Sequence, residues 1–206
     1  MRMLKMRSKL ILTDCDGVLL DWSFKFDQFM KNKGYTLTDE YPYVYGIENW
    51  FNEILDKKHG RQLVVEFNES DWIAHLPTFR DAVKYVKKLN EEHGYVFGVI
   101  TSLSDNPRAV ELRERNLNNI FGANVFDFIK CIETGANKDA ELNKFKDSEC
   151  WWIEDKVSNA EAGLKYGLNP ILMSHPHNDN YLIKRNSNMR IAGNWKQIYN
   201  IITGAF

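Results

Sequence analysis

The chain has 206 residues, of which 44% are hydrophobic and 27% charged, a composition typical of globular rather than disordered proteins. Its 27 lysines and arginines nearly balance its 28 aspartates and glutamates, so we expect no basic surface for a nucleic-acid polymer. The length suits one core with a modest inserted lobe.

The cysteine content and the first nine residues indicate the cellular compartment in which the protein works. The three cysteines are an odd number without the spacing of a metal site, which favours a reducing environment over a disulfide framework. Four basic residues among the first nine precede an apolar run that stops at Asp14, too short for a membrane span and unlike a signal peptide. We therefore expect a cytoplasmic protein with no membrane partner, and the sequence leaves a homodimer open.

The first element is an apolar run over residues 10–13 that ends in Asp14-Cys15-Asp16-Gly17. Such a run predicts a buried strand that delivers acids to the edge of a sheet. In an extended chain, side chains two residues apart share a face, so Asp14 and Asp16 can point at one substrate atom. Two carboxylates that close push each other's pKa values apart, which suits a nucleophile beside a general acid. A simple turn that ends a strand has the same pattern.

Residues 21–76 are rich in aromatic side chains and have no strong strand pattern. Helical spacing recurs at Trp22, Phe26 and Phe29, and the segment holds ten acidic residues against six lysines and arginines. An acidic, mostly helical insert is a poor surface for DNA and a plausible lid. We expect a small helical cap here, with residues 1–20 and 77–206 forming the core.

From residue 77 onward, strand and helix patterns alternate. Thr78 is the predicted N-cap of a helix that Gly94 ends, and Asn106-Pro107 begins another helix. The predicted strands are residues 95–100, 125–129, 150–153 and 171–173, with a short helix at 139–145 and a terminal helix at 195–202. This alternation predicts an α/β fold with a doubly wound parallel sheet.

Polar groups follow three of the predicted strands: Asp14 with Asp16, Thr101 with Ser102, and Glu154 with Asp155. In such sheets, ligands bind outside the carboxyl ends of the strands, so these groups should meet at one edge. Phosphoryl transfer fits them, because a carboxylate can attack phosphorus while hydroxyl and cationic donors hold the phosphate. Lys138 is the natural additional cation, and Asp14 with Asp155 fits the carboxylate pair that Mg²⁺ prefers.

These residues, in this order, resemble the four motifs of the haloacid dehalogenase superfamily of phosphatases. The matching motifs are Asp14-x-Asp16-Gly17-Val18, then Thr101 or Ser102, then Lys138, then Ile153-Glu154-Asp155 followed by Ala160-Glu161-Ala162-Gly163. The resemblance spans residues 9–173 and leaves the aromatic segment as the cap that many members insert between the first two motifs. Two positions depart from the family pattern: Glu154, where many members carry glycine or aspartate, and Asn159, where an acid often stands.

The resemblance implies a role for each motif residue. Asp14 would be the nucleophile that forms an aspartyl-phosphate, and Asp16 would protonate the leaving group and then activate water. Lys138 with Thr101 or Ser102 would hold the phosphate. The expected cofactor is Mg²⁺, bound by Asp14, the Asp16 backbone carbonyl and Asp155, with Glu154 as a further candidate ligand.

A finer resemblance is to the 5'(3')-deoxyribonucleotidases. It rests on Asp16-Gly17-Val18-Leu19-x-Asp21-Trp22, on Leu76-Pro77 ahead of Phe79-Arg80-Asp81-Ala82, and on His177-Asn178 followed by Asn194-Trp195. The aromatic residue eight positions after the nucleophile, here Trp22, stacks on the substrate base in that family, and such stacking is worth about 1–3 kcal/mol. The family's lysine shortly after the second motif is absent, with Asp105 in its place.

The leading hypothesis is therefore a Mg²⁺-dependent phosphatase for small phosphate monoesters, most of all (deoxy)nucleoside 5'-monophosphates. Alternatives are a sugar-phosphate phosphatase or phosphoglucomutase-like phosphotransferase, which Glu154-Asp155 resembles, and a non-catalytic binding module on the same fold. Trp50, Phe51 and Trp72 could complete the base-binding wall or form the core of the cap. His175-x-His177 with Asp179 is interpreted as a solvated loop rather than a zinc site.

Overall fold

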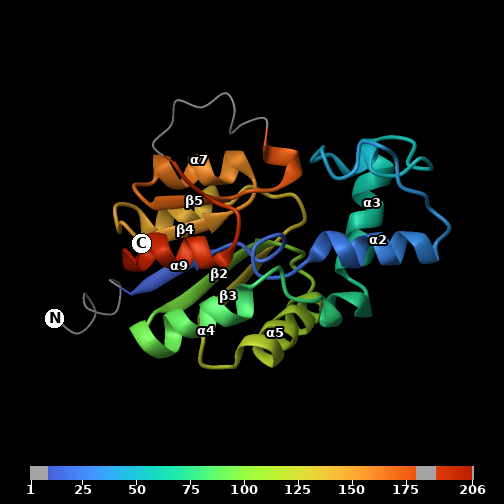
Figure 1. The fold of residues 1–206 in the computed structure, drawn as a ribbon. Helices are drawn as coiled ribbons and strands as arrows, with labels where there is room; N and C mark the ends of the chain where they lie inside the picture. Colours follow the sequence, from blue (N-terminus) through green and yellow to red (C-terminus); the bar gives the residue numbers. More distant parts are fainter. Residues whose placement is uncertain (1–8, 180–188, 206) are drawn as a thin grey trace.

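The computed structural model describes residues 9–179 and 189–205. Six strands form one parallel sheet in the order β3-β2-β1-β4-β5-β6 (Figure 1). The strands are β1 (Leu10–Thr13), β2 (Val96–Ser102), β3 (Phe126–Ile132), β4 (Trp151–Glu154), β5 (Asn169–Met173) and β6 (Arg190–Ala192). The predicted doubly wound α/β fold is confirmed.

Helices cover both faces of the sheet. The α-helices are α2 (Trp22–Asn32), α3 (Lys57–Asn68), α4 (Ala82–His93), α5 (Pro107–Phe121), α6 (Asp139–Leu142), α7 (Val157–Lys165) and α9 (Trp195–Thr203). The short 3-10 helices are η1 (Ile47–Asn49), η2 (Asp71–His75), η3 (Asn143–Phe145) and η4 (Pro176–Asn178). Side chains of α4, α5 and α9 pack with Ile11 on one face, while α6 packs with Leu10 and Leu12 on the other. The alternation along β1 thus supplies both layers of the core, as a central parallel strand must.

Helices α2 and α3 lie beside the carboxyl ends of the strands, away from the sheet layers (Figure 1). Phe26, Phe51 and Phe67 are almost completely buried there, and the ring of Phe26 packs against the other two as part of the main hydrophobic core. The chain leaves and re-enters the sheet layers side by side, because the Asp21 amide donates to the Pro77 carbonyl. The division into a core and a cap over residues 21–76 stays a prediction. If it holds, helices α2 and α3 are the main elements of the cap.

Two local predictions were wrong. Thr78 does not cap a helix: it pairs with Leu20 in a β-bridge, Arg80 has a left-handed φ of 47°, and α4 begins at Ala82. The tertiary pairing with residues 19 and 20 outweighs the capping preference of a threonine. The strand at 171–173 is not the last one either, since β6 adds an edge strand whose three residues are too few to give a periodic signal.

In the described part of the chain, no helix combines the length and the apolar composition that crossing a bilayer would require.

Gly98 allows β2 to pass closely beneath aromatic side chains. A Cβ atom built there would overlap the ring of Phe128 and lie 3.1 Å from Leu12 Cδ2. We predict that Gly98→Ala lowers the free energy of unfolding by about 1–3 kcal/mol, because overpacking displaces the ring. Urea denaturation measures this change in the free energy of unfolding. Gly60→Ala in α3 is the matched control, since its Cβ would meet no atom within 3.5 Å; it should be neutral or stabilising by up to about 1 kcal/mol. Equal stabilities for Gly98→Ala and wild type would contradict this packing.

Candidate active site

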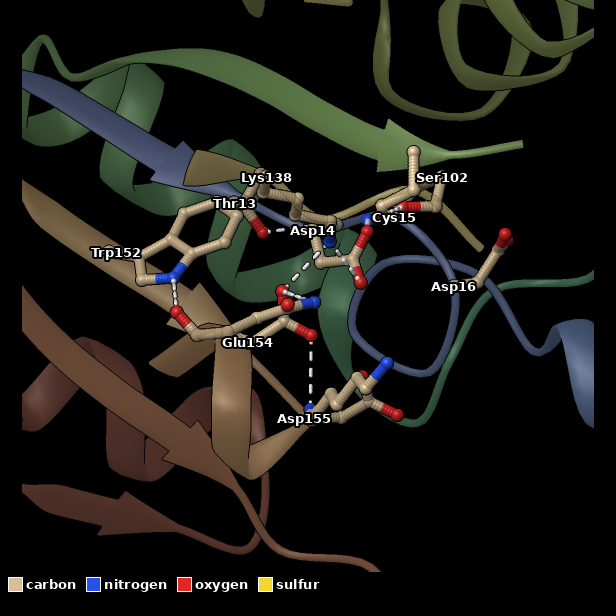
Figure 2. Close-up of polar contacts among 12 residues, drawn as sticks. Thr13, Asp14, Cys15, Asp16, Ser102, Lys138, Trp152, Glu154 and Asp155 are labelled. Atoms are coloured by element: carbon tan, nitrogen blue, oxygen red, sulfur yellow. Dashed lines mark hydrogen bonds and ion pairs between the residues drawn. The ribbon is translucent and has the colours of Figure 1, made fainter. Parts of the chain in front are cut away.

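A buried lysine bridges two carboxylates at the carboxyl edge of the sheet. Lys138, immediately before α6, places Nζ 2.7 Å from Asp14 Oδ2 and 2.8 Å from Glu154 Oε2 (Figure 2). The side chain of Lys138 is 1% exposed, and that of Glu154 is fully buried. The two carboxylates raise the pKa of Lys138 above its ordinary value even though burial opposes this, so the lysine stays charged.

Neighbouring strands bring these carboxylates together. Thr13 of β1 lies opposite Ile153 of β4, so the next residues, Asp14 and Glu154, emerge side by side. The Asp14 amide donates to the Ile153 carbonyl at 2.8 Å, and Asp14 Oδ1 accepts the Cys15 amide at 2.6 Å. Both oxygens of Asp14 are therefore held by donors, which fixes the direction of its carboxylate.

Glu154 has partners beyond Lys138. Its Oε1 accepts the Lys156 amide at 3.0 Å, and its Oε2 accepts Asn159 Nδ2 at 3.3 Å. Asn159, one of the two departures from the family pattern, is thus a donor to Glu154, the other departure. The structure places Glu154 as the counter-ion of Lys138 and as an anchor for the start of α7; its predicted contact with a metal stays a prediction.

Three carboxylates lie close together at this edge of the sheet. Oxygen atoms of Asp14, Glu154 and Asp155 lie within 4.8 Å of one another, and Figure 2 shows all three around one point. Burial, with the charge of Glu154 added, raises the pKa of Asp14 to about 7; burial and the charge of Asp14 raise that of Asp155 to about 7. The cluster carries more negative charge than Lys138 can balance, and an all-oxygen donor set is the kind that Mg²⁺ selects. The residues present therefore fit a hard divalent cation.

Gly17 allows Asp155 to approach the loop after β1. It has a left-handed φ of 74°, and a Cβ there would lie only 2.6 Å from Asp155 Oδ2. Asn178, buried after β5, donates from Nδ2 to the backbone carbonyls of Asp155 and Met173, at 2.8 Å each. The position of Asp155 is thus set by two loops as well as by β4.

The two predicted hydroxyls differ. Ser102 Oγ donates to the Ala136 carbonyl at 2.9 Å, whereas Thr101 Oγ1 is buried and has no hydrogen-bond partner within the described ranges. Both residues lie within the last positions of β2 rather than after it. An unpartnered buried hydroxyl is costly unless a ligand satisfies it, so Thr101 is the better candidate to hold a bound anion.

Asp16 lies apart from this cluster. In Figure 2 its carboxylate points away from Asp14 and Asp155. Its partner is Arg113 of α5: Nη1 lies 2.6 Å from Asp16 Oδ1 and Nη2 lies 3.3 Å from Oδ2. Burial raises the pKa of Asp16, and the charge of Arg113 opposes the rise. Our sequence reasoning missed Arg113, although its place on the same helix face as Ala109 and Asn116 marks it as buried.

The histidine loop is not the solvated loop that the sequence predicted. His175 Nε2 lies 2.8 Å from the Gly17 carbonyl, and its ring stacks on Phe79 with centroids 4.8 Å apart. Burial lowers the pKa of His175 to about 4, so the neutral ring donates from Nε2 to Gly17. His177 Nε2 lies 3.8 Å from Asp155 Oδ2. Within the described residues, the acidic side chains grouped closely enough to hold a metal ion are Asp14, Glu154 and Asp155.

A pocket of about 690 Å³ extends from these groups to helices α2 and α3. Trp22 and Trp50 form part of its wall, whereas Phe51 and Trp72 do not line it. The Trp22 ring stacks on Phe26 with centroids 4.5 Å apart, and its Nε1 donates to Asn68 Oδ1 at 2.9 Å. Trp22 is therefore both packed against the hydrophobic core and a fixed surface of the pocket.

Sequence comparison gives a narrow result. No protein-family model matches the chain. An uncharacterized 32.4 kDa protein from the Gp30–rIII intergenic region of Enterobacteria phage T4 is 28% identical over 134 residues, which is 63% of this chain. The match covers 47% of the phage protein, so this chain spans about half the length of the curated relative it matches.

Solved structures give a broader result. A haloacid dehalogenase-like hydrolase from Streptococcus pneumoniae has a TM-score of 0.67 at 15% identity, covering 94% of this chain and 98% of its own. A predicted phosphatase from Clostridium acetobutylicum has a TM-score of 0.64 at 14% identity, and the match covers 95% of this chain and 98% of that protein. A haloacid dehalogenase family hydrolase from Deinococcus radiodurans, solved with phosphate and sodium, has a TM-score of 0.62 at 16% identity, and the match covers 96% of each chain. With its parallel sheet and its acidic rim, this chain has the fold of the haloacid dehalogenase superfamily.

Proposed function

We propose that the protein is a phosphatase that hydrolyses small phosphate monoesters through an aspartyl-phosphate on Asp14. The observation that carries this proposal is the orientation of Asp14, held by Lys138 and the Cys15 amide at the pocket, beside the unpartnered hydroxyl of Thr101. The Asp14 carboxylate attacks phosphorus, while Lys138 Nζ and Thr101 Oγ1 donate to the phosphoryl oxygens. Asp16 gives a proton to the leaving oxygen, then takes one from the water that releases phosphate.

The proposed cofactor is Mg²⁺, with Asp14, Asp155 and the Asp16 backbone carbonyl as the residues that would hold it. When bound, it would neutralise charge on the phosphate and on the carboxylates. The excess of carboxylates over Lys138 supports this choice, and so does the phosphate and sodium in the Deinococcus radiodurans structure.

The proposed substrates are (deoxy)nucleoside 5'-monophosphates. A pocket of about 690 Å³ is of the size that encloses a small molecule, and Trp22 with Trp50 offers aromatic surface for a base. The hydrogen bond from Trp22 to Asn68 fixes the ring before a ligand arrives, which reduces the entropy lost on stacking. A small cytoplasmic metabolite, rather than a nucleic-acid polymer or a membrane, remains the proposed partner, and a homodimer stays open.

Loss of the nucleophile tests the reaction class. We predict that Asp14→Asn lowers phosphate release from p-nitrophenyl phosphate and from dUMP by more than about a thousandfold, because no covalent intermediate can form. Asp127→Asn, an exposed acid at the amino end of β3, is the control and should leave the rate unchanged. Substantial activity in Asp14→Asn would sink the mechanism. A wild-type protein that binds dUMP without releasing phosphate would support the binding-module alternative.

Metal binding should depend on pH with a defined sign. Because the pKa values of Asp14 and Asp155 are raised to about 7, these carboxylates are increasingly protonated as the pH falls below 7, and protons then compete with the cation. We predict that millimolar Mg²⁺ raises the thermal unfolding midpoint at pH 8 and much less at pH 5.5. Asp155→Asn should lose the Mg²⁺ effect at pH 8, while Asp127→Asn should keep it. An equal shift in Asp155→Asn and wild type would exclude this site.

The base-stacking role of Trp22 has its own test. We predict that Trp22→Ala raises KM for dUMP by about 5- to 150-fold, the equivalent of 1–3 kcal/mol of stacking, and changes KM for ribose 5-phosphate little. Phe24→Ala, at an exposed position of the same helix, is the matched control. Steady-state kinetics on both substrates measures the effect. Faster turnover of hexose phosphates than of dUMP by the wild type would instead favour the sugar-phosphate alternative.

A further inference from the structure

Arg113 is a charged side chain beside the site to which the proposed reaction gives no role. It is fully buried on α5 and forms an ion pair with Asp16, whose side chain is 23% exposed. Arg113 Nε has no hydrogen-bond partner within the described residues, so the guanidinium directs its two terminal nitrogens to Asp16. Burying a guanidinium costs desolvation free energy, and its ion pair often adds little net stability. The pair of Arg113 with Asp16 is therefore a candidate for a functional role.

The helix that carries Arg113 is held firmly. Asn106 Oδ1 accepts the Arg108 amide at its start, and Asn116 Nδ2 donates to the Leu76 carbonyl at the junction with the cap. Ala109 and Leu112 on the same helix face are buried against the sheet. Arg113 therefore presents a rigid cation to the loop after β1, where Asp16 would otherwise rotate freely about its side-chain bonds.

The two contacts between Arg113 and Asp16 are unequal. Nη1 to Oδ1 is 2.6 Å, a strong charge-assisted bond, whereas Nη2 to Oδ2 is 3.3 Å and weak. Oδ1 is thus the anchored oxygen and Oδ2 the freer one. Asp16 also lines the pocket, so its freer oxygen can serve a ligand while the other stays bound to α5.

From this geometry we infer that Arg113 is the positioning residue of the acid–base group: it holds Asp16 by Oδ1 and leaves Oδ2 to carry the proton to the leaving oxygen. This inference rests on the proposed phosphatase function. As the Asp14–phosphorus bond forms and the phosphorus–oxygen ester bond breaks, the proton on Oδ2 moves to the departing oxygen. Oδ2 then takes a proton from the water that attacks the aspartyl-phosphate, which restores Asp14 and releases inorganic phosphate.

The test compares two aryl esters of similar shape. The p-nitrophenolate of p-nitrophenyl phosphate leaves without a proton, whereas the phenolate of phenyl phosphate leaves poorly unless it is protonated. Arg113→Met should lower kcat/KM for phenyl phosphate roughly tenfold or more and for p-nitrophenyl phosphate less than about threefold. Arg113→Lys keeps a cation near Oδ1 and should fall between wild type and Arg113→Met. Because both esters are measured on one protein sample, a loss of folded protein lowers both rates equally and leaves their ratio unchanged.

A double variant separates positioning from general damage. Asp16→Asn should show the same dependence on the leaving group, and adding Arg113→Met to it should cause no further loss if Arg113 acts through Asp16. Equal losses on both esters, or a further loss in the Asp16→Asn background, would overturn the inference and leave the phosphatase assignment intact. Failure of the wild type to release phosphate from either ester would overturn the proposed function itself.

Discussion

The ion pairs of Lys138 are the interaction on which the rest of the site depends. A lysine that is 1% exposed requires negative partners, and it finds them in Asp14 and Glu154. Those partners stand together because β1 and β4 are paired in a register that brings residues 14 and 154 out side by side. Removing one partner of a buried pair typically costs about 3–5 kcal/mol, so the pairing of β1 with β4 and the position of Asp14 are stabilised together.

The same cluster contains three carboxylates, Asp14, Glu154 and Asp155, and one lysine, Lys138, to balance them. Burial and mutual repulsion raise the pKa values of Asp14 and Asp155 to about 7, which means that their ionised forms are destabilised in the folded protein. Under the proposed function, this loss of stability accompanies a cluster that would hold a divalent cation, a trade that active sites commonly make. The nearby Asp16 has a different environment because it forms an ion pair with Arg113. In the proposed reaction, these two aspartates have different tasks: Asp14 is the nucleophile and Asp16 the general acid.

Sequence reasoning located the elements whose signal is local. Asp14, Thr101 and Asp155 could be placed at one edge because each follows or ends an apolar run, and parallel strands end on the same side. Lys138 does not directly follow such a strand; the sequence offered it as an additional cation, and the family resemblance gave it the role of holding the phosphate. Features that depend on distant pairing were missed: β6, whose three residues form a strand only against β5, and the start of α4, displaced by the bridge between Leu20 and Thr78.

Arg113 is a residue of the candidate site that the sequence alone did not predict. An arginine in a helix is ordinarily exposed, and nothing adjacent in the chain points to Asp16, which lies 97 positions earlier. The segment 21–76 poses a related problem. Its aromatic residues are spaced for a helical core, and only their packing separates Trp22 and Trp50, which line the pocket, from Phe51, which fills the interior. Composition alone could not divide them, because one apolar ring serves either purpose.

The central claim is that phosphate passes through Asp14, and trapping the intermediate tests it most directly. Borohydride reduces an aspartyl-phosphate to homoserine, so wild-type protein quenched with borohydride during turnover of p-nitrophenyl phosphate should yield a peptide with homoserine at position 14. Mass spectrometry of the digested protein identifies the position. Sustained phosphate release with unmodified Asp14, or with homoserine at another aspartate, would contradict the account.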